Sequence, residues 1–416
     1  MSDITNISRR DFLKTGAVIG GGLMLGFSFP FLVPSSEAVP AIAQQKVSVG
    51  VVTSLSGVYA SMGEDQIRGS RCAADEIGDR ILGKPIELVP IDDEGKPGAG
   101  ARKVREAIQS KGVNYFVGAI SSGVALAVGQ VAHEEKAIYF NSSGADELTG
   151  SQCNRHVFRY SLPAYGAIEQ TVRPLLKMFP DAKRWYTITP DYVFGHSLLN
   201  NTIRILKEVG AEHVGNDMYP LGLTEFSSFI TKAMASKAEV VAFFNYGDDT
   251  ISALKQAHNF GLDRKAKILV PWSTGLTPME EIGPEACEGV YFGCHFWHTV
   301  DVPLARKLCE VWLKKFNRYP SYTEASAYIM TKLEFMGMEK AGTTDVEPVI
   351  KALEGLKYAG LTGEEEIQAF DHQVKKKYYL LLAKAKKDIK GLGDNASIVS
   401  SGVSVKSQAE SDCKMK

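Results

Sequence analysis

The sequence contains none of the short motifs that mark common nucleotide-binding and hydrolytic sites. No GxGxxG follows a predicted strand, and neither GxxxxGKS/T nor GxSxG occurs in the 416 residues. A nucleophile with a neighbouring base is equally absent. Because phosphate-binding loops and nucleophile elbows depend on these spacings, their absence argues against a nucleotide-dependent enzyme and against a hydrolase. We therefore expect a protein that is not an enzyme.

The cysteines and histidines do not predict a metal site. The six cysteines contain no CxxC pair, and their pairing into disulfides cannot be read from their positions. His295 and His298 lie three residues apart, but we interpret them as incidental histidines of a strand or hinge. A formal net charge of −1 gives no reason to expect a nucleic-acid or anionic-membrane partner. The sequence thus predicts neither a metal nor a cofactor.

Only one long apolar run is present, and it lies at the N-terminus. Residues 8–14 read SRRDFLK, which is the pattern of a twin-arginine export signal, and a glycine-rich apolar run follows. Ala41-Ile42-Ala43 then fits a small-residue cleavage site. A membrane anchor is the alternative, but the run is short and broken by two prolines. We predict a signal peptide over residues 1–43 and a periplasmic mature protein, in which disulfides can form.

After residue 46, segments typical of strands alternate with segments typical of helices. In the first unit, alternating valines from Val47 predict a strand, Ser54–Gly57 predict a turn, and helical spacing resumes after Gly63. Further strands are expected at residues 84–91, 113–118 and 137–140. The pattern restarts with strands at 184–189, 239–245, 266–270 and 289–294, before a mainly helical region. This alternation predicts an α/β fold of doubly wound parallel sheets in two successive lobes.

Three polar segments are predicted to lie in solvent. The acidic runs at residues 92–94 and 364–366 are interpreted as solvated turns. The stretch from residue 388 to 416 is rich in serine, glycine and lysine, and it is predicted to be a disordered tail.

Serine-rich turns follow two neighbouring predicted strands. One carries Ser121 and Ser122, and the next carries Ser142, Ser143 and Gly144. Hydroxyls together with the free backbone N–H groups at a helix start hold a carboxylate without a lysine or arginine. Helix capping by serine is the alternative interpretation. Because both turns follow neighbouring strands, the sequence favours a carboxylate site.

Aromatic side chains occupy the corresponding turns of both lobes. The first predicted turn contains Tyr59 and Met62. The second lobe contributes Tyr192, Phe194, Tyr246 and Trp272. Such residues are commonly core residues, but turns are usually polar, so three aromatic turns in one lobe favour a ligand site.

At these positions the chain resembles the type I periplasmic solute-binding proteins of ABC importers, in the branched-chain amino acid and amide class. The resemblance extends over roughly residues 46–385. The segments that carry it are Val49–Gly57, Val117–Ser122, Glu147–Thr149, Asp191–Gly195, Tyr246-Gly247 and, as in the aromatic-acid and amide branch, Asp371-His372-Gln373.

The resemblance implies two Rossmann-like lobes joined by three crossings, with a hinge that closes on a ligand. Lobe 1 would comprise residues 46–162 and 295–370, and lobe 2 residues 163–294 and 371–387. By position, Ser122, Ser142 and Gly144 match the carboxylate-binding turns, while Phe194 and Tyr246 match aromatic residues beside the ligand. The implied partners are a small-molecule ligand and an ABC permease in the inner membrane, and we expect a monomer.

The sequence departs from the leucine-type members at two positions. Their glutamate that holds the ligand ammonium would fall in the turn Pro271–Thr274, which contains no acid, and Glu280 is too far along. At the position of Gly144, the leucine-type members have a threonine after the serine turn. A buried ammonium without a carboxylate is costly, so the sequence favours a ligand without an α-ammonium, unless Asp191 or Asp248 substitutes.

We therefore expect a binding protein for an aromatic or other hydrophobic organic acid. A binder of branched-chain or other amino acids or amides from the same family is the alternative. A ligand-binding sensor on the same fold is another, and neighbouring permease and ATPase genes would distinguish it.

Overall fold

The computed structural model describes residues 46–273 and 275–415. All described residues belong to one compact unit. The predicted signal peptide lies outside the described residues. Within them, no helix has both the length and the hydropathy needed to cross a bilayer.

A six-stranded sheet forms the centre of the first lobe, in the order β2-β3-β1-β4-β5-β6. All neighbouring strands are parallel except the short hairpin of β2 and β3. The strands are β1 (Val47–Thr53), β2 (Arg80–Ile81), β3 (Lys84–Asp92), β4 (Tyr115–Gly118), β5 (Ile138–Asn141) and β6 (Val157–Arg159).

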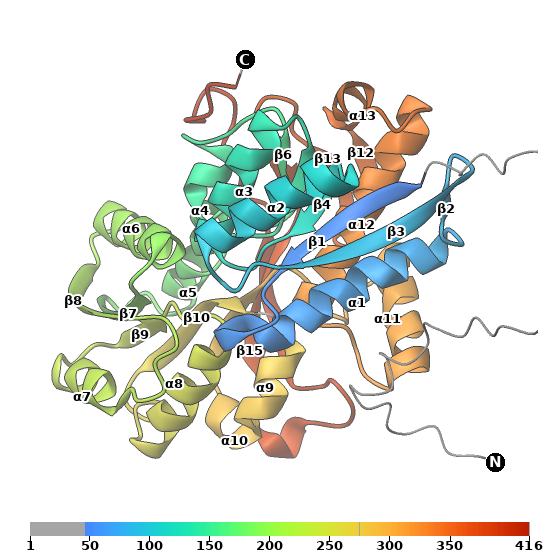
Figure 1. Cartoon of the computed structure of the whole chain (residues 1–416). Helices are drawn as coiled ribbons and strands as arrows, with labels where there is room; N and C mark the ends of the chain where they lie inside the picture. The colour runs from blue at the N-terminus through green and yellow to red at the C-terminus, as the bar shows by residue number, and fades with distance from the viewer. Residues whose placement is uncertain (1–45, 274, 416) are drawn as a thin grey trace, which may run out of the picture. The chain divides into compact units, whose positions relative to one another are not determined.

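Helices cover both faces of this sheet (Figure 1). Val52 and Phe116 pack with Val128 of α3, whereas Val49 and Val117 belong to the core shared with α1 and α12. The helices of the first lobe are α1 (Ala60–Glu76), α2 (Pro97–Lys111), α3 (Ser122–Glu134), α12 (Tyr322–Ala341) and α13 (Val346–Leu353). Alternate residues of each strand thus face opposite helical layers, as expected for a doubly wound sheet.

A seven-stranded sheet forms the second lobe, in the order β16-β15-β11-β10-β9-β7-β8. The strands are β7 (Arg184–Pro190), β8 (Glu212–Tyr219), β9 (Val240–Phe243), β10 (Lys267–Ser273), β11 (Tyr291–Cys294), β15 (Tyr378–Ala383) and β16 (Ala396–Gly402). The five strands β7 to β11 are parallel to their neighbours in the sheet, and β15 and β16 add an antiparallel edge.

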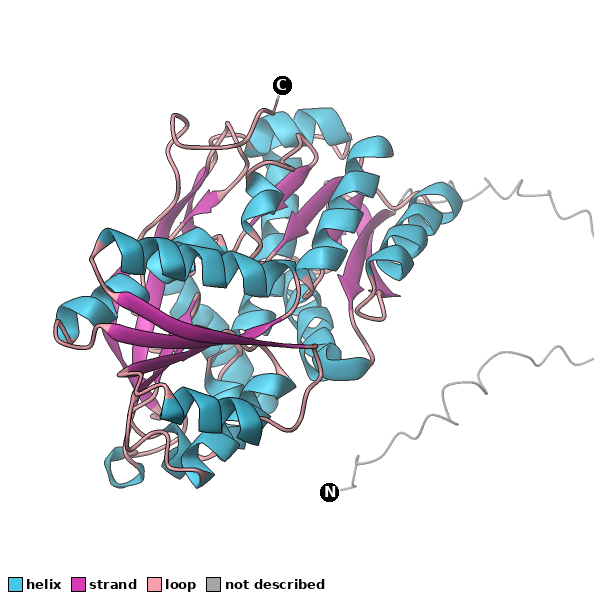
Figure 2. Ribbon diagram, turned by 90° about the vertical axis from the view of Figure 1, so that its left-hand side faces the viewer, coloured by secondary structure: helices cyan, strands magenta, loops and turns pink. Residues whose placement is uncertain are grey.

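Helices also lie on both sides of the second sheet, as Figure 2 shows in cyan against the magenta strands. Val240 and Ala242 pack with α4, α5 and α6, and Val241 and Phe243 face the layer of α7 to α10. These helices are α4 (Ala164–Glu169), α5 (Val172–Met178), α6 (Val193–Glu208), α7 (Ser227–Ala235), α8 (Asp248–Asn259), α9 (Leu276–Ile282) and α10 (Pro284–Cys287).

Three crossings connect the sheets. The chain passes from β6 to α4, from β11 to α11 (Pro303–Phe316), and from β14 to β15. Before the third crossing it forms a small antiparallel sheet of β12 (Lys357–Gly360), β13 (Gly363–Ile367) and β14 (Val374–Lys375). Short 3-10 turns complete the chain as η1 (Gly57–Tyr59), η2 (Asp146–Thr149) and η3 (Lys386–Asp388).

The structure confirms the predicted α/β class and corrects the interpretation of all three polar segments. The segment predicted to be a disordered tail contains β16, which pairs with β15 from Tyr378↔Gly402 to Ala383↔Ala396. Asp93 is buried, and the hydrogen bond that Ser54 Oγ donates to its carboxylate at 2.6 Å offsets the cost of this burial. Glu365 is also buried, and the hydrogen bonds that it accepts from the Thr362 N–H and the Tyr358 hydroxyl offset the cost of burial.

Glu334 of α12 is fully buried in the first lobe, and neither of its carboxylate oxygens makes a hydrogen bond of normal geometry. Burial raises its pKa well above the usual value, and the backbone of Phe116 offsets this only in part. A raised folded pKa contributes stability at low pH, and this stability is lost as pH rises from the unfolded pKa toward the folded one.

We predict that Glu334→Gln becomes more stabilising, relative to the wild type, as pH rises from 5 to 7.5. The amide mimics the protonated acid and does not ionise, whereas the wild type loses about 1.4 kcal/mol per pH unit in this window. Urea unfolding at both pH values measures the difference. Glu310→Gln, at an exposed position of α11, is the control and should show no such trend. An equal effect of Glu334→Gln at both pH values would contradict a protonated Glu334.

Candidate functional site

Two turns at the carboxyl ends of β4 and β5 are held together by their own serines. Ser143 Oγ donates to the carbonyl of Ala119 at 3.0 Å, and Ser122 Oγ accepts from the Ala145 N–H at 3.2 Å. Both side chains are almost completely buried. Their hydroxyls are therefore occupied in fixing the relative position of the two turns.

The remaining polar groups of these turns are free to meet a ligand. Ser121 is the N-cap residue of α3, and its hydroxyl does not cap the helix. The first N–H groups of an α-helix have no partner within the helix, and they favour an anion. Ser142 Oγ lies 3.5 Å from the hydroxyl of Ser326, which donates its proton to the Thr323 carbonyl at 3.0 Å.

Gly144 is the point at which the second lobe touches the serine turns. A Cβ atom placed on Gly144 would lie 2.2 Å from Phe194 Cε2 and 2.9 Å from Trp272 Cη2. The rings of Phe194 and Trp272 meet edge to face, with centroids 4.8 Å apart. The absence of a side chain at Gly144 thus allows two aromatic rings to lie directly on the turn.

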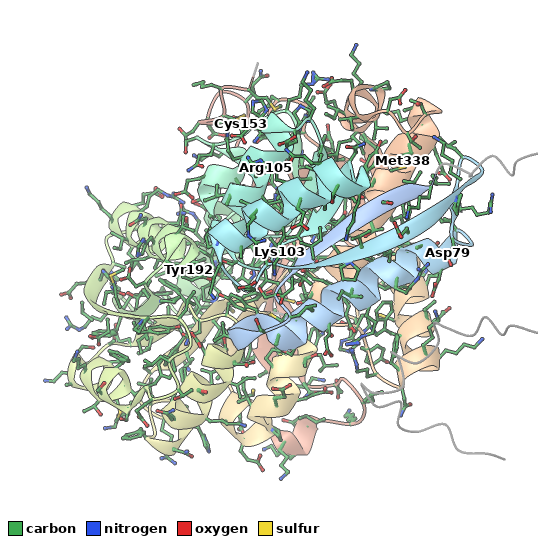
Figure 3. All side chains as sticks on the ribbon, viewed as in Figure 1. Asp79, Lys103, Arg105, Cys153, Tyr192 and Met338 are labelled. Atoms are coloured by element: carbon green, nitrogen blue, oxygen red, sulfur yellow. A yellow bond between two sulfur atoms is a disulfide. The ribbon has the colours of Figure 1, made fainter. Side chains whose placement is uncertain are left out.

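A second contact between the lobes is built around Tyr59. Tyr59 and Met62 are buried in a small cluster with Ile120, and Tyr246 of the second lobe packs against it. The Tyr59 and Tyr246 ring centroids are 6.3 Å apart. The Tyr59 hydroxyl is buried and interacts with that of Tyr192 without a hydrogen bond of normal geometry, and burial raises its pKa. Figure 3 labels Tyr192, which lies where α6 begins.

The structure adds two residues that the sequence analysis did not select, Tyr322 and Thr323 at the start of α12. Their hydroxyls are buried and have no hydrogen-bond partner of normal geometry. Tyr322 stacks on His295 at 4.7 Å, and His295 contacts the ring of Trp272 at 4.2 Å. Thr323 interacts with the Tyr246 hydroxyl, although burial dominates and raises the pKa of Tyr246. Nothing in the local sequence distinguishes these residues from an ordinary helix start.

His295 has a structural role next to Trp272 and Tyr322. Its Nε2 accepts a hydrogen bond from the Leu162 N–H at 2.9 Å, which joins the first two crossings. Burial lowers its pKa well below the usual value, with Lys376 acting in the same direction, so the ring is neutral. Across residues 46–273 and 275–415, no three His, Cys, Asp or Glu side chains are grouped to hold a metal ion.

One carboxylate is buried near the tyrosines, and it is not one that the sequence analysis considered. Asp191, Asp248 and Glu280 are exposed. Asp249, at the start of α8, is 2% exposed and accepts a hydrogen bond from the Gly222 N–H at 3.3 Å. Burial raises its pKa to about 6. Its charge acts on Tyr59 and Tyr219, which places Asp249 at the edge of the aromatic cluster.

These features define an α/β binding protein with two lobes. A model of the periplasmic binding protein family matches residues 46–388, and one of the twin-arginine translocation pathway signal sequence matches residues 6–26. The chain belongs to the periplasmic binding protein family, and its signal sequence directs export to the periplasm.

The chain is 27% identical over 325 residues to the Leu/Ile/Val-binding protein BraC3 of Rhizobium johnstonii, covering 77% of this chain and 86% of the relative. It is 41% identical to the amino acid ABC transporter substrate-binding protein from Pseudomonas fluorescens Pf-5. That structure superposes with a TM-score of 0.85 over 89% of this chain and 99% of the other. An R. palustris ABC transporter solute-binding protein in complex with benzoate shares the fold, with a TM-score of 0.80 and 21% identity over 89% of this chain and 100% of the other.

The protein is therefore a periplasmic solute-binding protein of an ABC transporter, of the branched-chain amino acid type. Proteins of this class bind a small molecule and deliver it to a permease. The resemblance, the periplasmic location and the fold class inferred from the sequence are confirmed.

We predict that Gly144→Ala destabilises the protein by about 1–3 kcal/mol, because its Cβ overlaps the Phe194 ring. In a Phe194→Ala background the same substitution should cost less, since the two closest overlapping atoms, both of Phe194, are gone and only Trp272 Cη2 at 2.9 Å remains. A double-mutant cycle by urea unfolding measures this coupling. Gly98→Ala in α2, where nothing lies within 4 Å of the added Cβ, is the matched control. Equal costs of Gly144→Ala in the two backgrounds would rule out the contact.

Proposed function

We propose that the protein binds a small organic acid with a flat apolar body, aromatic or otherwise hydrophobic, between its lobes for uptake. In this proposal the two sheets with their helices are the two lobes, and the crossings form the hinge. The ligand would lie between the serine turns and the aromatic residues of α6, of the turn before α8 and of β10.

The neutral serine turns support the carboxylate part of the proposal. Ser121, the Ser142 hydroxyl and the N-terminal N–H groups of α3 offer donors without a formal positive charge. A carboxylate held by several such donors keeps its charge in a site with few waters. Ser122 and Ser143 would act indirectly, by fixing the turns on which these donors lie.

The aromatic residues support the flat apolar part of the proposal. Phe194 and Trp272 lie directly on Gly144, and Tyr59, Met62 and Tyr246 form the neighbouring wall. Aromatic rings prefer edge-to-face or offset contacts, which a planar ligand can continue. The end of β10, Pro271–Ser273, contributes no carboxylate that could hold an ammonium.

An amino acid is the second candidate, and Asp249 is the observation that favours it. Its buried carboxylate lies near Tyr59 and interacts with the Gly222 N–H and the Tyr219 hydroxyl. A ligand ammonium beside it would stabilise the ionised form of Asp249. The 41%-identical relative, described as an amino acid ABC transporter substrate-binding protein, agrees with this candidate.

The midpoint temperature of thermal unfolding, measured with and without candidate ligands, tests both the organic-acid and the amino-acid proposal. Benzoate and 4-hydroxybenzoate should raise the midpoint, whereas leucine, isoleucine and valine should not. A ligand present at 100 times its Kd stabilises the folded state by about 2.7 kcal/mol. Stabilisation only by the amino acids would refute the organic-acid proposal.

Asp249→Asn separates the two candidates by a second measurement, the ligand affinity. Removal of the charge should change the Kd of an organic acid by less than about three-fold, because an organic acid has no ammonium. For an amino acid, loss of a buried ion-pair partner should weaken binding by about 100-fold or more. Asp248→Asn, its exposed neighbour, is the matched control.

A further inference from the structure

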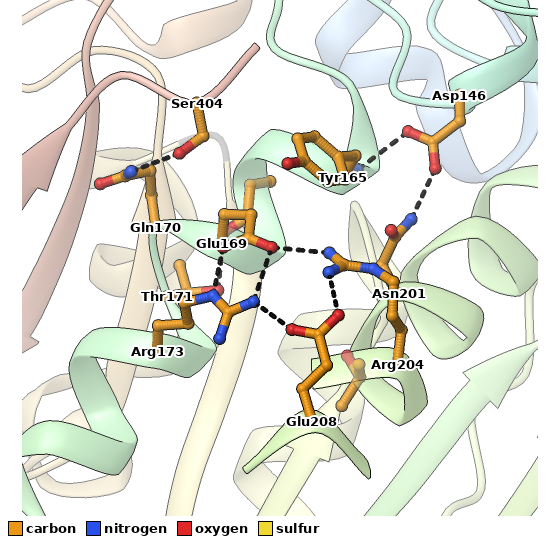
Figure 4. A network of polar contacts seen from close by, with 12 residues as sticks. Asp146, Tyr165, Glu169, Gln170, Thr171, Arg173, Asn201, Arg204, Glu208 and Ser404 are labelled. Atoms are coloured by element: carbon orange, nitrogen blue, oxygen red, sulfur yellow. Dashed lines mark hydrogen bonds and ion pairs between the residues drawn. The ribbon is translucent and has the colours of Figure 1, made fainter. Parts of the chain in front are cut away.

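The C-terminal segment after β16 crosses from the second lobe to the first. In the second lobe, Gln170 Nε2 donates to Ser404 Oγ at 2.6 Å, as Figure 4 shows, and Val405 packs against the core around Leu162 and Leu175. The ammonium of Lys406 lies 5.8 Å from the ring centroid of Tyr165. The segment is therefore attached to α4 immediately after it leaves the sheet.

The same segment is attached to the first lobe from Lys406 onward. The carbonyl of Lys406 accepts a hydrogen bond from Gln368 Nε2 at 3.2 Å, and Cys413 forms a disulfide with Cys153. Cys153 lies between η2 and β6, and Figure 3 labels it at this end of the lobe. The loop that contains Gln368 also belongs to this lobe, since His372 stacks on Phe158 of β6 at 4.0 Å.

The C-terminal segment lies near a set of hydrogen bonds that join the two lobes directly. The Ala164 N–H donates to the Gly144 carbonyl at 2.7 Å, and the Tyr165 N–H donates to Asp146 Oδ1 at 2.9 Å. Asn201 of α6 donates to Asp146 Oδ2 at 2.5 Å (Figure 4). A cavity of about 230 Å³ is lined both by Asp146 and Tyr165 of these bonds and by Lys406 and Asp412 of the C-terminal segment.

We propose that residues 403–413, closed by the Cys153–Cys413 disulfide, form a covalent strap that limits separation of the two lobes and is released by reduction. The three chain crossings allow a hinge motion, and the strap adds a fourth connection beside the crossing from β6 to α4. Between Val405 and Cys413 the strap spans at most about 28 Å when fully extended. Without the disulfide, the strap keeps the Gln368 hydrogen bond and the contact of Cys413 Sγ with the Phe370 carbonyl at 3.5 Å as polar contacts with the first lobe.

Reduction at this disulfide requires an external dithiol. The dithiol gives two electrons and two protons to the bond, so Cys153 and Cys413 become thiols and the reductant becomes a cyclic disulfide. Both cysteines are half-buried and therefore within reach, whereas Cys72, Cys287, Cys294 and Cys309 are buried free thiols. The strap is thus a redox-sensitive element in a protein that is exported to an oxidising compartment.

Amide hydrogen exchange of the mature protein tests the strap. Dithiothreitol should accelerate exchange at Ala164 and Tyr165 by about ten-fold, because separation of the lobes breaks their hydrogen bonds. Exchange at Val51 of β1 and Val241 of β9, in the centres of the two sheets, should change by less than about two-fold. The double variant Cys153→Ser/Cys413→Ser should show the fast rates without reductant and should not respond to it.

Three results would overturn the strap. Unchanged rates at Ala164 and Tyr165 after reduction would mean that the disulfide does not restrain the lobes. Equal acceleration at Val51 and Val241 would mean that it only stabilises the whole fold. A response of the double variant to dithiothreitol would count against the strap as well. None of these results depends on which ligand binds, so they are independent of the proposed ligand class.

Discussion

A single buried guanidinium, that of Arg159 at the end of β6, fixes the part of the molecule on which the serine turns depend. It is 1% exposed and donates to the Ala145 carbonyl at 2.5 Å, to Gln373 Oε1 at 2.7 Å and to the Thr149 hydroxyl. Burial lowers its pKa to about 10, and the nearby acids oppose this shift. A buried cation without partners is strongly unfavourable, so these acceptors are held in place. The last strand of the first sheet, the turn after β5 and the third crossing are thereby joined at one point.

Local periodicity predicted those parts of the fold that are decided locally. The buried parallel strands and the amphipathic helices were recognised because their apolar spacing is set by the face that each buries. The edge strands β8 and β16 are largely polar and half-exposed, so no comparable pattern marked them. Asp93 and Glu365 were placed in solvent because the partners that allow their burial, such as Ser54 for Asp93, are fixed only in the folded chain.

The site was predictable to the extent that it lies on strand ends. The residues that meet across the lobes, Gly144 with Phe194 and Tyr59 with Tyr246, had been selected because turns rich in serine or aromatic residues are unusual. Tyr322 and Thr323 reach the same region from a helix far along the chain, and no local feature marks them. The resulting surface contains many neutral hydroxyls and one buried acid, Asp249. Selectivity in such a surface depends on shape and on the match of donors more than on net charge.

The pairing of β16 with β15 has a consequence for the solubility of the chain. The family match ends at residue 388, before β16 begins. A chain shortened to that point would leave the apolar strand β15, from Tyr378 to Ala383, as an open sheet edge. Unpaired edges of this kind template association between chains. By pairing with β15, the segment after residue 388 therefore shields a strand edge that could otherwise pair with a neighbouring molecule.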